Sequence, residues 1–385
     1  MMERILNTLE SIKEEAWEIN DFMYRNPELG DQEYQAVEKL TAFLSKHHFK
    51  IEMGIADKPT AFMAIYNSNI PGPKIAYLCE YDALPEIGHG CGHNMIGTMS
   101  ALAGIALSKI VGEIGGTVIV LGTPAEETDG GKVYMVEKGI FGDIDIAMIL
   151  HPLGETFESG GSLALDAIQF DFRGKTSHAA AQPEAGINAL DAAIQTFNGI
   201  NALRQHIQSD VRIHGIIKEG GVAANVVPDK AVAQFYVRAK ERTYLDTVVD
   251  KVRNIAKGAA LMTGATVNIS NYQISYDNMI TNQVLSKAFI NNLKKVGVTE
   301  INPARASFGS IDMGNVSHVV PSIHPYIGLN HPNVNAHTKK MADLTVSEIA
   351  HERIIQGAAA LALTGYEIIN DNGLLMKIQK EFSED

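Results

Sequence analysis

Three segments of this chain run from a buried-strand pattern directly into side chains that bind metal ions or move protons. The segments are KIAYLC, TVIVLG and IDIAMIL, each short and rich in aliphatic residues. Such runs are typical of buried strands in a parallel sheet, and functional groups gather at the carboxyl ends of such strands. The side chains that follow the three segments are Asp82, Cys91, His93, Glu126, Glu127 and His151. We therefore expect these side chains to share one site.

The loop that carries Cys91 and His93 has the composition of a metal-binding loop. Thiolate and imidazole both bind borderline-soft divalent ions, and glycines at positions 88, 90 and 92 let the backbone bend closely around an ion. His89 lies in the same loop, and we expect it to support the site or to face solvent rather than to bind the ion.

The adjacent carboxylates Glu126 and Glu127 indicate acid–base chemistry beside a cation. A helical first turn would also suit two acidic residues, but Thr128–Gly131 stops any helix at once. Two carboxylates at a buried strand end repel each other unless a cation or a shared proton relieves them. One carboxylate as metal ligand and its neighbour as general base meets that requirement.

Further candidates flank this set. Asp82 is expected to orient a metal-bound imidazole, because such histidines usually donate their second ring N–H to a carboxylate. His151 ends its apolar segment before a proline. Near the end of the chain, His331 and His337 are both candidate ligands, and their spacing alone does not choose between them.

Cysteine catalysis is the main chemical alternative, with Cys91 as nucleophile and a histidine as base. That mechanism leaves the paired carboxylates without a purpose, so the residues favour metal. A phosphate-binding loop is a weaker alternative, because no G-x-G-x-x-G or G-x-x-x-x-G-K-[ST] pattern follows the first strand.

Composition narrows the class of protein. The chain has 385 residues, enough for two domains, and a formal net charge of −13, with no basic stripe to bind nucleic acid. Its N-terminus lacks the basic start and apolar core of a signal peptide, and no long apolar run predicts a membrane span. Two cysteines make no disulfide framework, so we expect a cytoplasmic protein.

The pattern of elements predicts an α/β domain with a parallel-rich sheet flanked by helices and interrupted by an inserted domain. Helices are expected over Glu3–Arg25, over Asp31–His47 with Asp31 as N-cap, and over Thr345–Leu363. Between them, two successive βαβ patterns predict a ferredoxin-like α+β sandwich. The expected division is 1–165 and 277–385 for the catalytic domain, with 166–276 as the insertion. Because such a sandwich exposes a sheet edge, pairing of two edges predicts a homodimer.

Several motifs, in the same order along nearly the whole chain, resemble the amidohydrolase group of dinuclear-metal peptidases. That group contains aminoacylases, hippurate and auxin-conjugate hydrolases, and aminobenzoyl-glutamate hydrolase. The stretch Ser307–Tyr326 is similar to the branch of aminobenzoyl-glutamate hydrolase and basic-dipeptide dipeptidases. The motifs that carry the wider resemblance are CEYDALPEIGHGCGHNMIG (Cys79–Gly97), GTPAEE (Gly122–Glu127), HP (His151–Pro152), FRGKTSHAAAQPEAGINALDA (Phe172–Ala192) and AANVVPD (Ala223–Asp229).

The resemblance implies a role for each matching residue. Glu126 would be the general base, His178 would reach the partner subunit's active site and polarise the substrate carbonyl, and Asn225 would help to bind the substrate. His337 rather than His331 would be the last ligand of two divalent ions per subunit, Zn²⁺ or Mn²⁺. The metal ligands implied by the resemblance are Cys91, His93, Glu127, His151 and His337.

These expectations describe a metal-dependent amidohydrolase that cleaves an N-acyl amino acid or a dipeptide-like amide. Asn94 stands where hippurate-type relatives have Asp, which puts a hippurate-type substrate in doubt. A dipeptidase of narrow specificity and a catalytically silent ligand-binding relative are the remaining alternatives. The partners expected are a small-molecule amide and a second copy of the chain, with neither nucleic acid nor membrane.

Overall fold

The computed structural model describes residues 1–305 and 309–384 and divides the chain into two compact units. Unit 1 comprises Met1–Gly161, a segment that begins at Met279, and a C-terminal part that begins at Asp312. Unit 2 comprises Ser162–Asn278 and a short stretch that ends at Ile311, whose return to unit 2 has no signal in the sequence. Ser307, the first residue of one family-like motif, lies outside the described residues.

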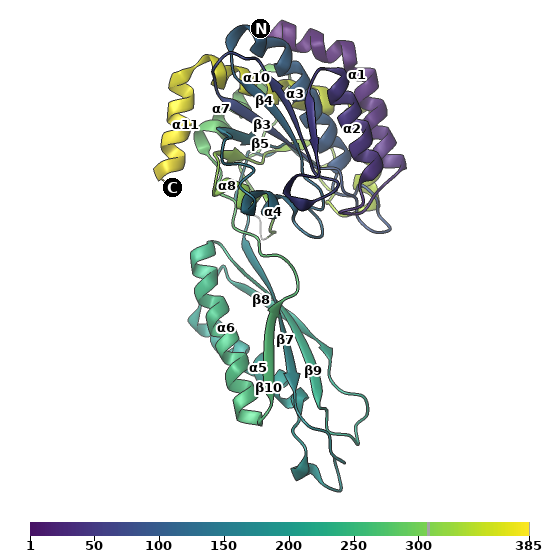
Figure 1. Ribbon diagram of the computed structural model, residues 1–385, viewed down its shortest axis with the longest axis vertical. Coiled ribbons are helices and arrows are strands. Elements are labelled where there is room, and N and C mark those ends of the chain that lie inside the picture. The colour runs from purple at the N-terminus through teal and green to yellow at the C-terminus, as the bar shows by residue number, and fades with distance from the viewer. Residues whose placement is uncertain (306–308, 385) are drawn as a thin grey trace. The chain divides into compact units, whose positions relative to one another are not determined.

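Unit 1 is built on a six-stranded sheet in the order β1-β2-β4-β3-β5-β11 (Figure 1). Strands β4, β3, β5 and β11 are parallel, whereas β1 and β2 extend the sheet in antiparallel fashion. A separate parallel pair joins β6 to β12. The strands are β1 (Lys50–Met53), β2 (Phe62–Asn67), β3 (Lys74–Cys79), β4 (Thr117–Gly122), β5 (Ile146–Met148), β6 (His151–Leu153), β11 (Ser322–Ile323) and β12 (Tyr326–Gly328).

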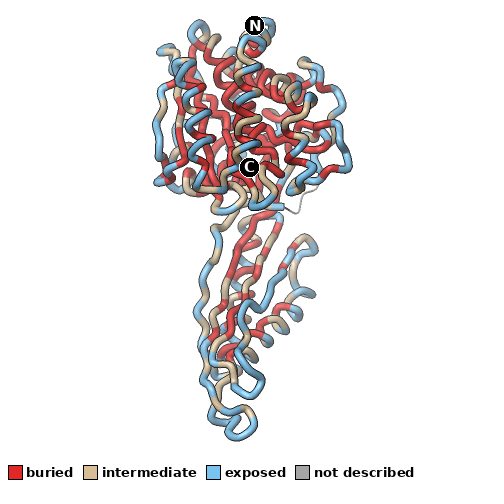
Figure 2. The backbone as a smooth tube through the Cα atoms, turned by 90° about the vertical axis from the view of Figure 1, so that its right-hand side faces the viewer, coloured by how far each residue is buried: buried red, intermediate tan, exposed pale blue. Residues whose placement is uncertain are grey.

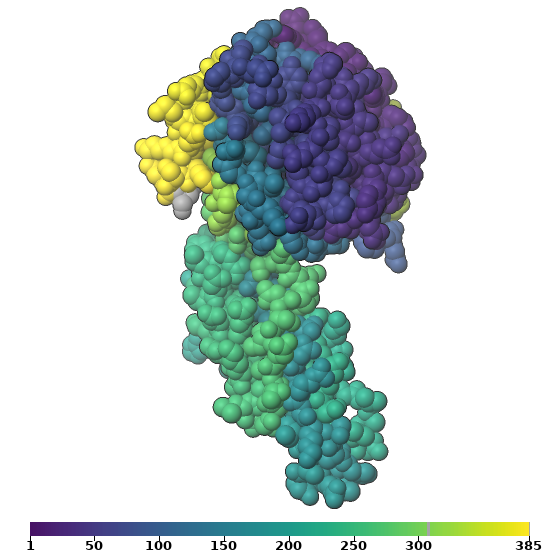
Figure 3. Space-filling view, in the orientation of Figure 1, coloured from purple at the N-terminus to yellow at the C-terminus, as the bar shows by residue number. Residues whose placement is uncertain are grey.

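Helices pack around this sheet, and three of them, α1, α3 and α10, contact one another. In the face of unit 1 that Figure 3 shows, the N-terminal and C-terminal residues form opposite sides. The helices are α1 (Met2–Arg25), α2 (Tyr34–Lys46), α3 (His93–Ile114), α4 (Gly131–Glu137), α7 (Gln283–Lys295), α8 (Met313–Ser317), α9 (Lys339–Leu344), α10 (Glu348–Asn370) and α11 (Asn372–Glu384).

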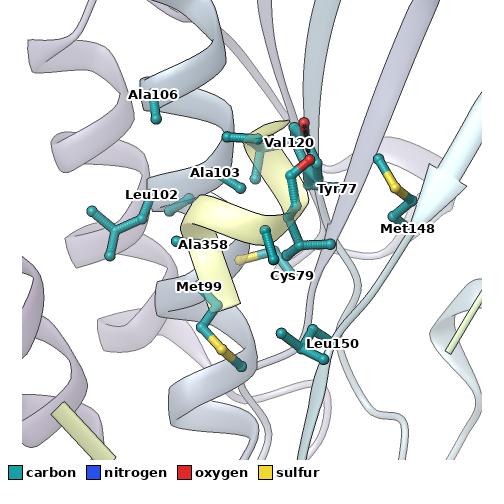
Figure 4. Close-up of a cluster of buried hydrophobic side chains, with 14 of the residues drawn as sticks. Tyr77, Cys79, Met99, Leu102, Ala103, Ala106, Val120, Met148, Leu150 and Ala358 are labelled. Atoms are coloured by element: carbon teal, nitrogen blue, oxygen red, sulfur yellow. Dashed lines mark hydrogen bonds between the residues drawn. The ribbon is translucent and has the colours of Figure 1, made fainter. Parts of the chain in front are cut away.

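The main core of unit 1 lies between the sheet and the pair α3 and α10, where buried side chains from both layers meet (Figure 4). Tyr77 and Cys79, two apart on β3, point to this side, as expected for alternation along a strand. The Tyr77 hydroxyl donates to the carbonyl of Leu361 at 3.1 Å, which satisfies its polar end inside the core. Figure 2 shows how the buried residues concentrate in the interior of unit 1.

Helix α3 is apolar on nearly every side. By length and composition it is, among the described residues, the one helix suited to crossing a membrane, although the core helix of a soluble protein meets the same criterion. Its residues are almost all buried against other elements of unit 1, so the fold itself accounts for its composition.

Two predicted helix ends are wrong. Asp31 does not cap α2: it has φ +64° and pairs with Lys58, while the Glu28 carboxylate accepts the amides of Gln35 and Ala36. A carboxylate from outside the helix replaces the expected N-cap, because the backbone turns again before the helix begins.

The single C-terminal helix expected to end near Leu363 is two helices, α10 and α11. They are separated at Asp371, whose Oδ1 accepts the amides of Gly373 and Leu374. An aspartate that caps a new helix is a local signal that apolar periodicity does not reveal.

Unit 2 has the topology of a ferredoxin-like sandwich. Its sheet has the order β10-β7-β9-β8 with every pair antiparallel, and two helices share its buried core. Strand β8 is an edge strand, and its residues Ile216 and Ile217 are exposed. The elements are β7 (Ala164–Arg173), α5 (Ala189–Leu203), β8 (Arg212–Glu219), β9 (Lys230–Ala239), α6 (Arg242–Thr263) and β10 (Thr266–Asn271).

Two glycines offer a matched test of the packing in unit 1. A Cβ at Gly122 would lie 2.2 Å from ring atoms of Phe62, whereas a Cβ at Gly112 meets nothing within 4 Å. We expect Gly122→Ala to lower the free energy of unfolding by roughly 1–3 kcal/mol, since the site is already filled. Gly112→Ala, in the exposed part of α3, should raise it by about 0.5–1 kcal/mol. Denaturant unfolding measures both, and equal stability of the two variants would contradict the packing.

Candidate metal centre

The parallel strands bring the predicted side chains to one edge of the sheet. Asp82 follows β3, the adjacent carboxylates follow β4, and His151 is the first residue of β6, just after β5. His93 begins α3 after Gly92, which has φ +82° and lies so close to Pro152 that a Cβ would clash. Ligand atoms of six residues form three overlapping groups, each within 4.8 Å: Cys91, His93 and His151; Cys91, Glu127 and His337; His93, Glu126 and Glu127.

His151 presents one ring nitrogen to this cluster. Its Nδ1 lies 2.7 Å from the carbonyl oxygen of Pro152, which can only accept a hydrogen bond, so Nδ1 carries the proton and Nε2 carries the lone pair. That Nε2 lies 3.3 Å from the Cys91 sulfur. Burial, together with neighbouring His324 and His93, lowers the pKa of His151 to about 3, so the imidazole is neutral, as a metal ligand must be.

Asp82 connects two candidate ligands: His93, at the start of α3, and Glu127, which follows β4. Its Oδ1 lies 2.8 Å from Nδ1 of His93, and its Oδ2 accepts the backbone N–H of Glu127 at 3.0 Å. The predicted role of Asp82, orientation of a metal-bound imidazole, matches this geometry. One buried carboxylate thereby sets the positions of both side chains.

The outer nitrogen of His93 indicates that a cation fits here. Nε2 is buried without a hydrogen bond, and Oε2 of Glu80 lies 3.4 Å from it. Burial alone would lower the pKa of His93, but Asp82 and Glu80 outweigh it and raise the pKa well above its usual value. The surroundings therefore favour positive charge at this nitrogen. A divalent ion would supply that charge, and thiolate, imidazole and carboxylate are its usual ligands.

His337 joins the cluster and His331 does not. Nε2 of His337 lies 3.1 Å from Oε1 of Glu127, and its backbone N–H donates to Gly90 O at 2.8 Å. The left-handed backbone of His337, with φ +63°, turns its segment at this point. His331 belongs to none of the metal-compatible groups among the described residues. Of the two histidines, the fold places only His337 beside the other candidate ligands.

The pKa values of the adjacent carboxyl groups of Glu126 and Glu127 are shifted in opposite directions. Burial, with Asp312 and Glu80 nearby, raises the pKa of Glu126 well above its usual value. Burial acts the same way on Glu127, but His337 and His93 outweigh it and lower the pKa of Glu127. When the pKa values of two neighbouring carboxyl groups differ in this way, one group can exchange protons while the other stays ionised.

Cys91 lacks the environment of a nucleophile. Burial raises the pKa of its thiol, with His93 opposing and Glu127 adding to the effect. A nucleophilic cysteine needs a lowered pKa, whereas a thiol that ligates a metal is deprotonated by the ion itself. The cysteine-hydrolase alternative is therefore not favoured.

Behind the cluster lies a buried ion group that the sequence did not reveal. Lys132 is fully buried, and its Nζ donates to Oε1 of Glu80 at 2.6 Å and to Oδ1 of Asp312 at 2.7 Å. Burial would lower the pKa of Lys132, but the two carboxylates raise it, so the lysine is charged. A lone lysine after Gly130 and Gly131 has no sequence pattern that marks it as buried.

Three other buried groups were also missed or left open. His324 lies beside His151 with ring centroids 5.5 Å apart, and His89 is buried, not solvent-exposed. Glu33 is buried too: its Oε1 accepts the N–H of Ala125 and its Oε2 accepts the hydroxyl of Thr60, each at 2.8 Å. Glu33 precedes α2 in a segment that carried no chemical signal.

His178 and Asn225 lie in unit 2, on two neighbouring segments that are joined by backbone hydrogen bonds. Nδ1 of His178 accepts the backbone amides of Ala180 at 3.2 Å and Ala181 at 3.1 Å. The backbone of Asn225 accepts the N–H of Ala179 at 3.0 Å. Because Nδ1 is an acceptor, the neutral ring carries its proton on Nε2, which makes the exposed nitrogen a hydrogen-bond donor.

Comparison with known proteins places this site in a family. A family described as peptidase dimerisation domain, M20_dimer, matches residues 163–262. The chain is 35% identical to the Xaa-Arg dipeptidase of Mus musculus, over 98% of this chain and 91% of that protein. The chain belongs to the M20 family of metallopeptidases.

Other M20 relatives agree with this assignment. The chain is 28% identical to one of the p-aminobenzoyl-glutamate hydrolase polypeptides of Escherichia coli (strain K12), covering 98% of this chain and 94% of that one. A crystal structure of a Bacillus subtilis protein, described as a dinuclear metal binding peptidase from the M20 family, has a TM-score of 0.68. It is 20% identical and covers 92% of this chain and 99% of its own.

Family membership confirms the resemblance and the fold class expected from the sequence. It also confirms the class of activity: this M20 protein is a metal-dependent hydrolase of amide bonds in small substrates. A catalytically silent relative is not favoured.

The pKa of Glu33 generates a test of the fold around the centre. Burial raises it from 4.5 to about 7, against the hydrogen bonds from Thr60 and Ala125 and with some help from Asp82. The protonated acid is thus favoured in the folded state, so its contribution to stability is complete below pH 4.5 and is lost as the pH rises through about 7. Glu33→Gln resembles the protonated acid and removes this loss.

We therefore expect the stability of Glu33→Gln relative to the wild type to increase between pH 5 and pH 8. The increase should be on the order of 3 kcal/mol, from about 1.4 kcal/mol for each unit of the pKa shift. Denaturant unfolding of the chelator-treated proteins at several pH values measures it. A stability difference that stays constant with pH would show that Glu33 titrates normally in the folded protein.

Proposed function

We propose that this M20 enzyme is a dipeptidase that removes a basic C-terminal residue from small dipeptide-like substrates. The observation that carries the proposal is 35% identity to an Xaa-Arg dipeptidase across 98% of the chain. The net charge of −13 also favours attraction of a cationic substrate. An acyl-glutamate is the second candidate, because the p-aminobenzoyl-glutamate hydrolase polypeptide of Escherichia coli aligns over the same length.

Two divalent ions, Zn²⁺ or Mn²⁺, are the proposed cofactors of each subunit. Bound ions supply Lewis acidity, which polarises a carbonyl group and lowers the pKa of a water molecule. The shared members of the three metal-compatible groups support two adjacent positions rather than one. The residues proposed to hold the ions are Cys91, His93, Glu127, His151 and His337.

Glu126 is the proposed general base. Its carboxylate takes a proton from the attacking water and returns it to the nitrogen of the leaving amine. A raised pKa suits the return step, since a carboxyl group that holds its proton more readily is a usable acid near neutral pH. Glu127, whose pKa is lowered, stays ionised and suits a ligand role.

His178 and Asn225 are proposed to bind the substrate from unit 2 of a partner subunit. The donor at Nε2 of His178 suits a carbonyl oxygen that gains negative charge in the transition state. The exposed edge strand β8, with apolar Ile216 and Ile217, supports a homodimer formed by pairing two such edges. A cytoplasmic location remains part of the proposal.

The substrate assignment is tested by hydrolysis of matched compounds. Dipeptides that end in Arg or Lys are compared with the same dipeptides that end in Glu, and with p-aminobenzoyl-glutamate, each with added Zn²⁺ or Mn²⁺. We expect the basic dipeptides to have the highest kcat/KM. Preference for the acyl-glutamate would select the second candidate, and no turnover of any amide would reject both.

Separate replacement of Glu126 and Glu127 should affect catalysis in one variant and metal binding in the other. We expect Glu126→Gln to retain metal but to lose about 10²–10⁴-fold in kcat, because an amide cannot accept the proton from water. Glu127→Gln should instead weaken metal binding, measured by titration of the chelator-treated protein. The reversed pair of results would exchange the two roles.

Mixing two inactive variants tests whether His178 acts on the neighbouring subunit. Dimers of the His178→Ala variant and of the Glu126→Gln variant are mixed, dissociated into subunits and re-associated. Each mixed dimer then contains one site with both residues intact. We expect part of the activity to return, measured as hydrolysis of a basic dipeptide. Mixed dimers that form but stay inactive would place the action of His178 within its own subunit or remove its role.

A further inference from the structure

The adjacent carboxylates Glu126 and Glu127 follow a backbone turn in a strained conformation. Ala125, immediately before Glu126, has φ +59°, a left-handed value that residues with a side chain adopt at a cost. The carbonyl of Ala125 accepts the amides of Asp129 at 3.0 Å and Gly130 at 2.8 Å, which closes the turn from one side. Such a conformation persists only when surrounding contacts impose it.

Glu33 supplies the contact on the other side of this turn. Its buried carboxylate accepts the N–H of Ala125 at 2.8 Å and the hydroxyl of Thr60 at 2.8 Å, so both oxygens are engaged. The carbonyl of Thr60 in turn accepts the hydroxyl of Tyr81, the neighbour of Asp82, at 2.6 Å. Glu33 and Thr60 thus link the Ala125 turn to the strand end that carries Asp82.

The segment around Glu33 also contacts the Ala125 turn independently of this carboxylate. A Cβ at Gly30 would lie 2.4 Å from Oγ1 of Thr128 and 2.9 Å from Ala125, so glycine permits a close approach. Lys58 bridges Asp31 of this segment, at 3.0 Å, to Asp129 of the turn, at 2.6 Å. These contacts leave little freedom for the turn to move relative to Glu33.

We propose that Glu33 is a positioning residue: its carboxylate holds the Ala125 turn in the left-handed conformation that presents Glu126 and Glu127 to the metal centre. The inference rests on the proposed function only for the roles of those two carboxylates. Glu33 acts through the reach of an acceptor oxygen to the Ala125 amide, not through its charge.

Two conservative variants separate reach from charge. Glu33→Gln keeps the length of the side chain, and its amide oxygen still accepts the Ala125 N–H. Glu33→Asp keeps an ionisable carboxyl group but is one methylene shorter, which withdraws the oxygen from Ala125. Thr60→Val is the matched control: it removes the other hydrogen bond to Glu33 and leaves the Ala125 contact in place.

The experiment uses the full-length chain, treated with chelator and titrated with Zn²⁺ or Mn²⁺ alone by calorimetry, with thermal unfolding and dipeptide kinetics in parallel. We expect Glu33→Asp to bind metal roughly 10–100-fold more weakly, as loss of a supporting partner commonly does, and to lower kcat more than it changes KM. Glu33→Gln should keep most of the affinity. Thr60→Val should lower the unfolding temperature without weakening metal binding.

Other outcomes overturn the inference. If Glu33→Asp binds metal better than Glu33→Gln, charge rather than reach is what matters. If Thr60→Val loses as much affinity as Glu33→Asp, or all variants bind as the wild type does, Glu33 serves stability alone. Absence of amide hydrolysis by the wild type would reject the proposed function, while the metal affinities would still decide the role of Glu33.

Discussion

Repulsion among carboxylates that are buried together is the constraint around which this site is organised. Glu80, Asp82 and Asp312 are almost fully buried near Glu126 and Glu127, where water cannot screen their charges. The protein compensates with cations of its own. Lys132 lies between Glu80 and Asp312. His93 lies 2.8 Å from Asp82 and 3.4 Å from the same Glu80. A divalent ion held at the His93 nitrogen would continue the same compensation.

Because their charges are compensated, the buried carboxylates can each hold a fixed position and make specific contacts. Asp82 accepts hydrogen bonds from both His93 and the backbone of Glu127, so a single residue sets the spacing between ligands from different strands. Burial acts to raise the pKa of both Glu126 and Glu127. Neighbouring carboxylates add to the rise at Glu126, whereas imidazoles outweigh it and lower the pKa of Glu127. Adjacent residues with the same chemistry thereby become chemically different.

The two units differ in their hydrophobic cores and in the residues that they expose. Unit 1 has a continuous apolar core under the metal centre, formed by the sheet with α3 and α10, which supports the strand ends rigidly. Unit 2 has its own smaller core and an exposed edge strand, together with a histidine whose proton is directed outward by two backbone amides. The family match to a peptidase dimerisation domain, residues 163–262, lies within this second unit.

Residue types and their order along the chain were enough to predict the α/β unit, the inserted sandwich, and a site at the ends of the strands that precede Asp82, Glu126 and His151. Alternation of side chains and aliphatic runs are local properties of the sequence, and parallel strands end at the same edge of a sheet. The two domains and the position of the site can therefore be predicted without the tertiary structure. The choice of His337 over His331, the burial of Lys132, and the contact of Glu33 with Ala125 were decided only by the tertiary structure. Each depends on a segment distant in sequence that approaches the site: 180 residues separate Lys132 from Asp312, and 92 separate Glu33 from Ala125. A polar side chain is expected to be exposed until its partner is placed beside it, because only the fold determines whether water or another residue satisfies its charge.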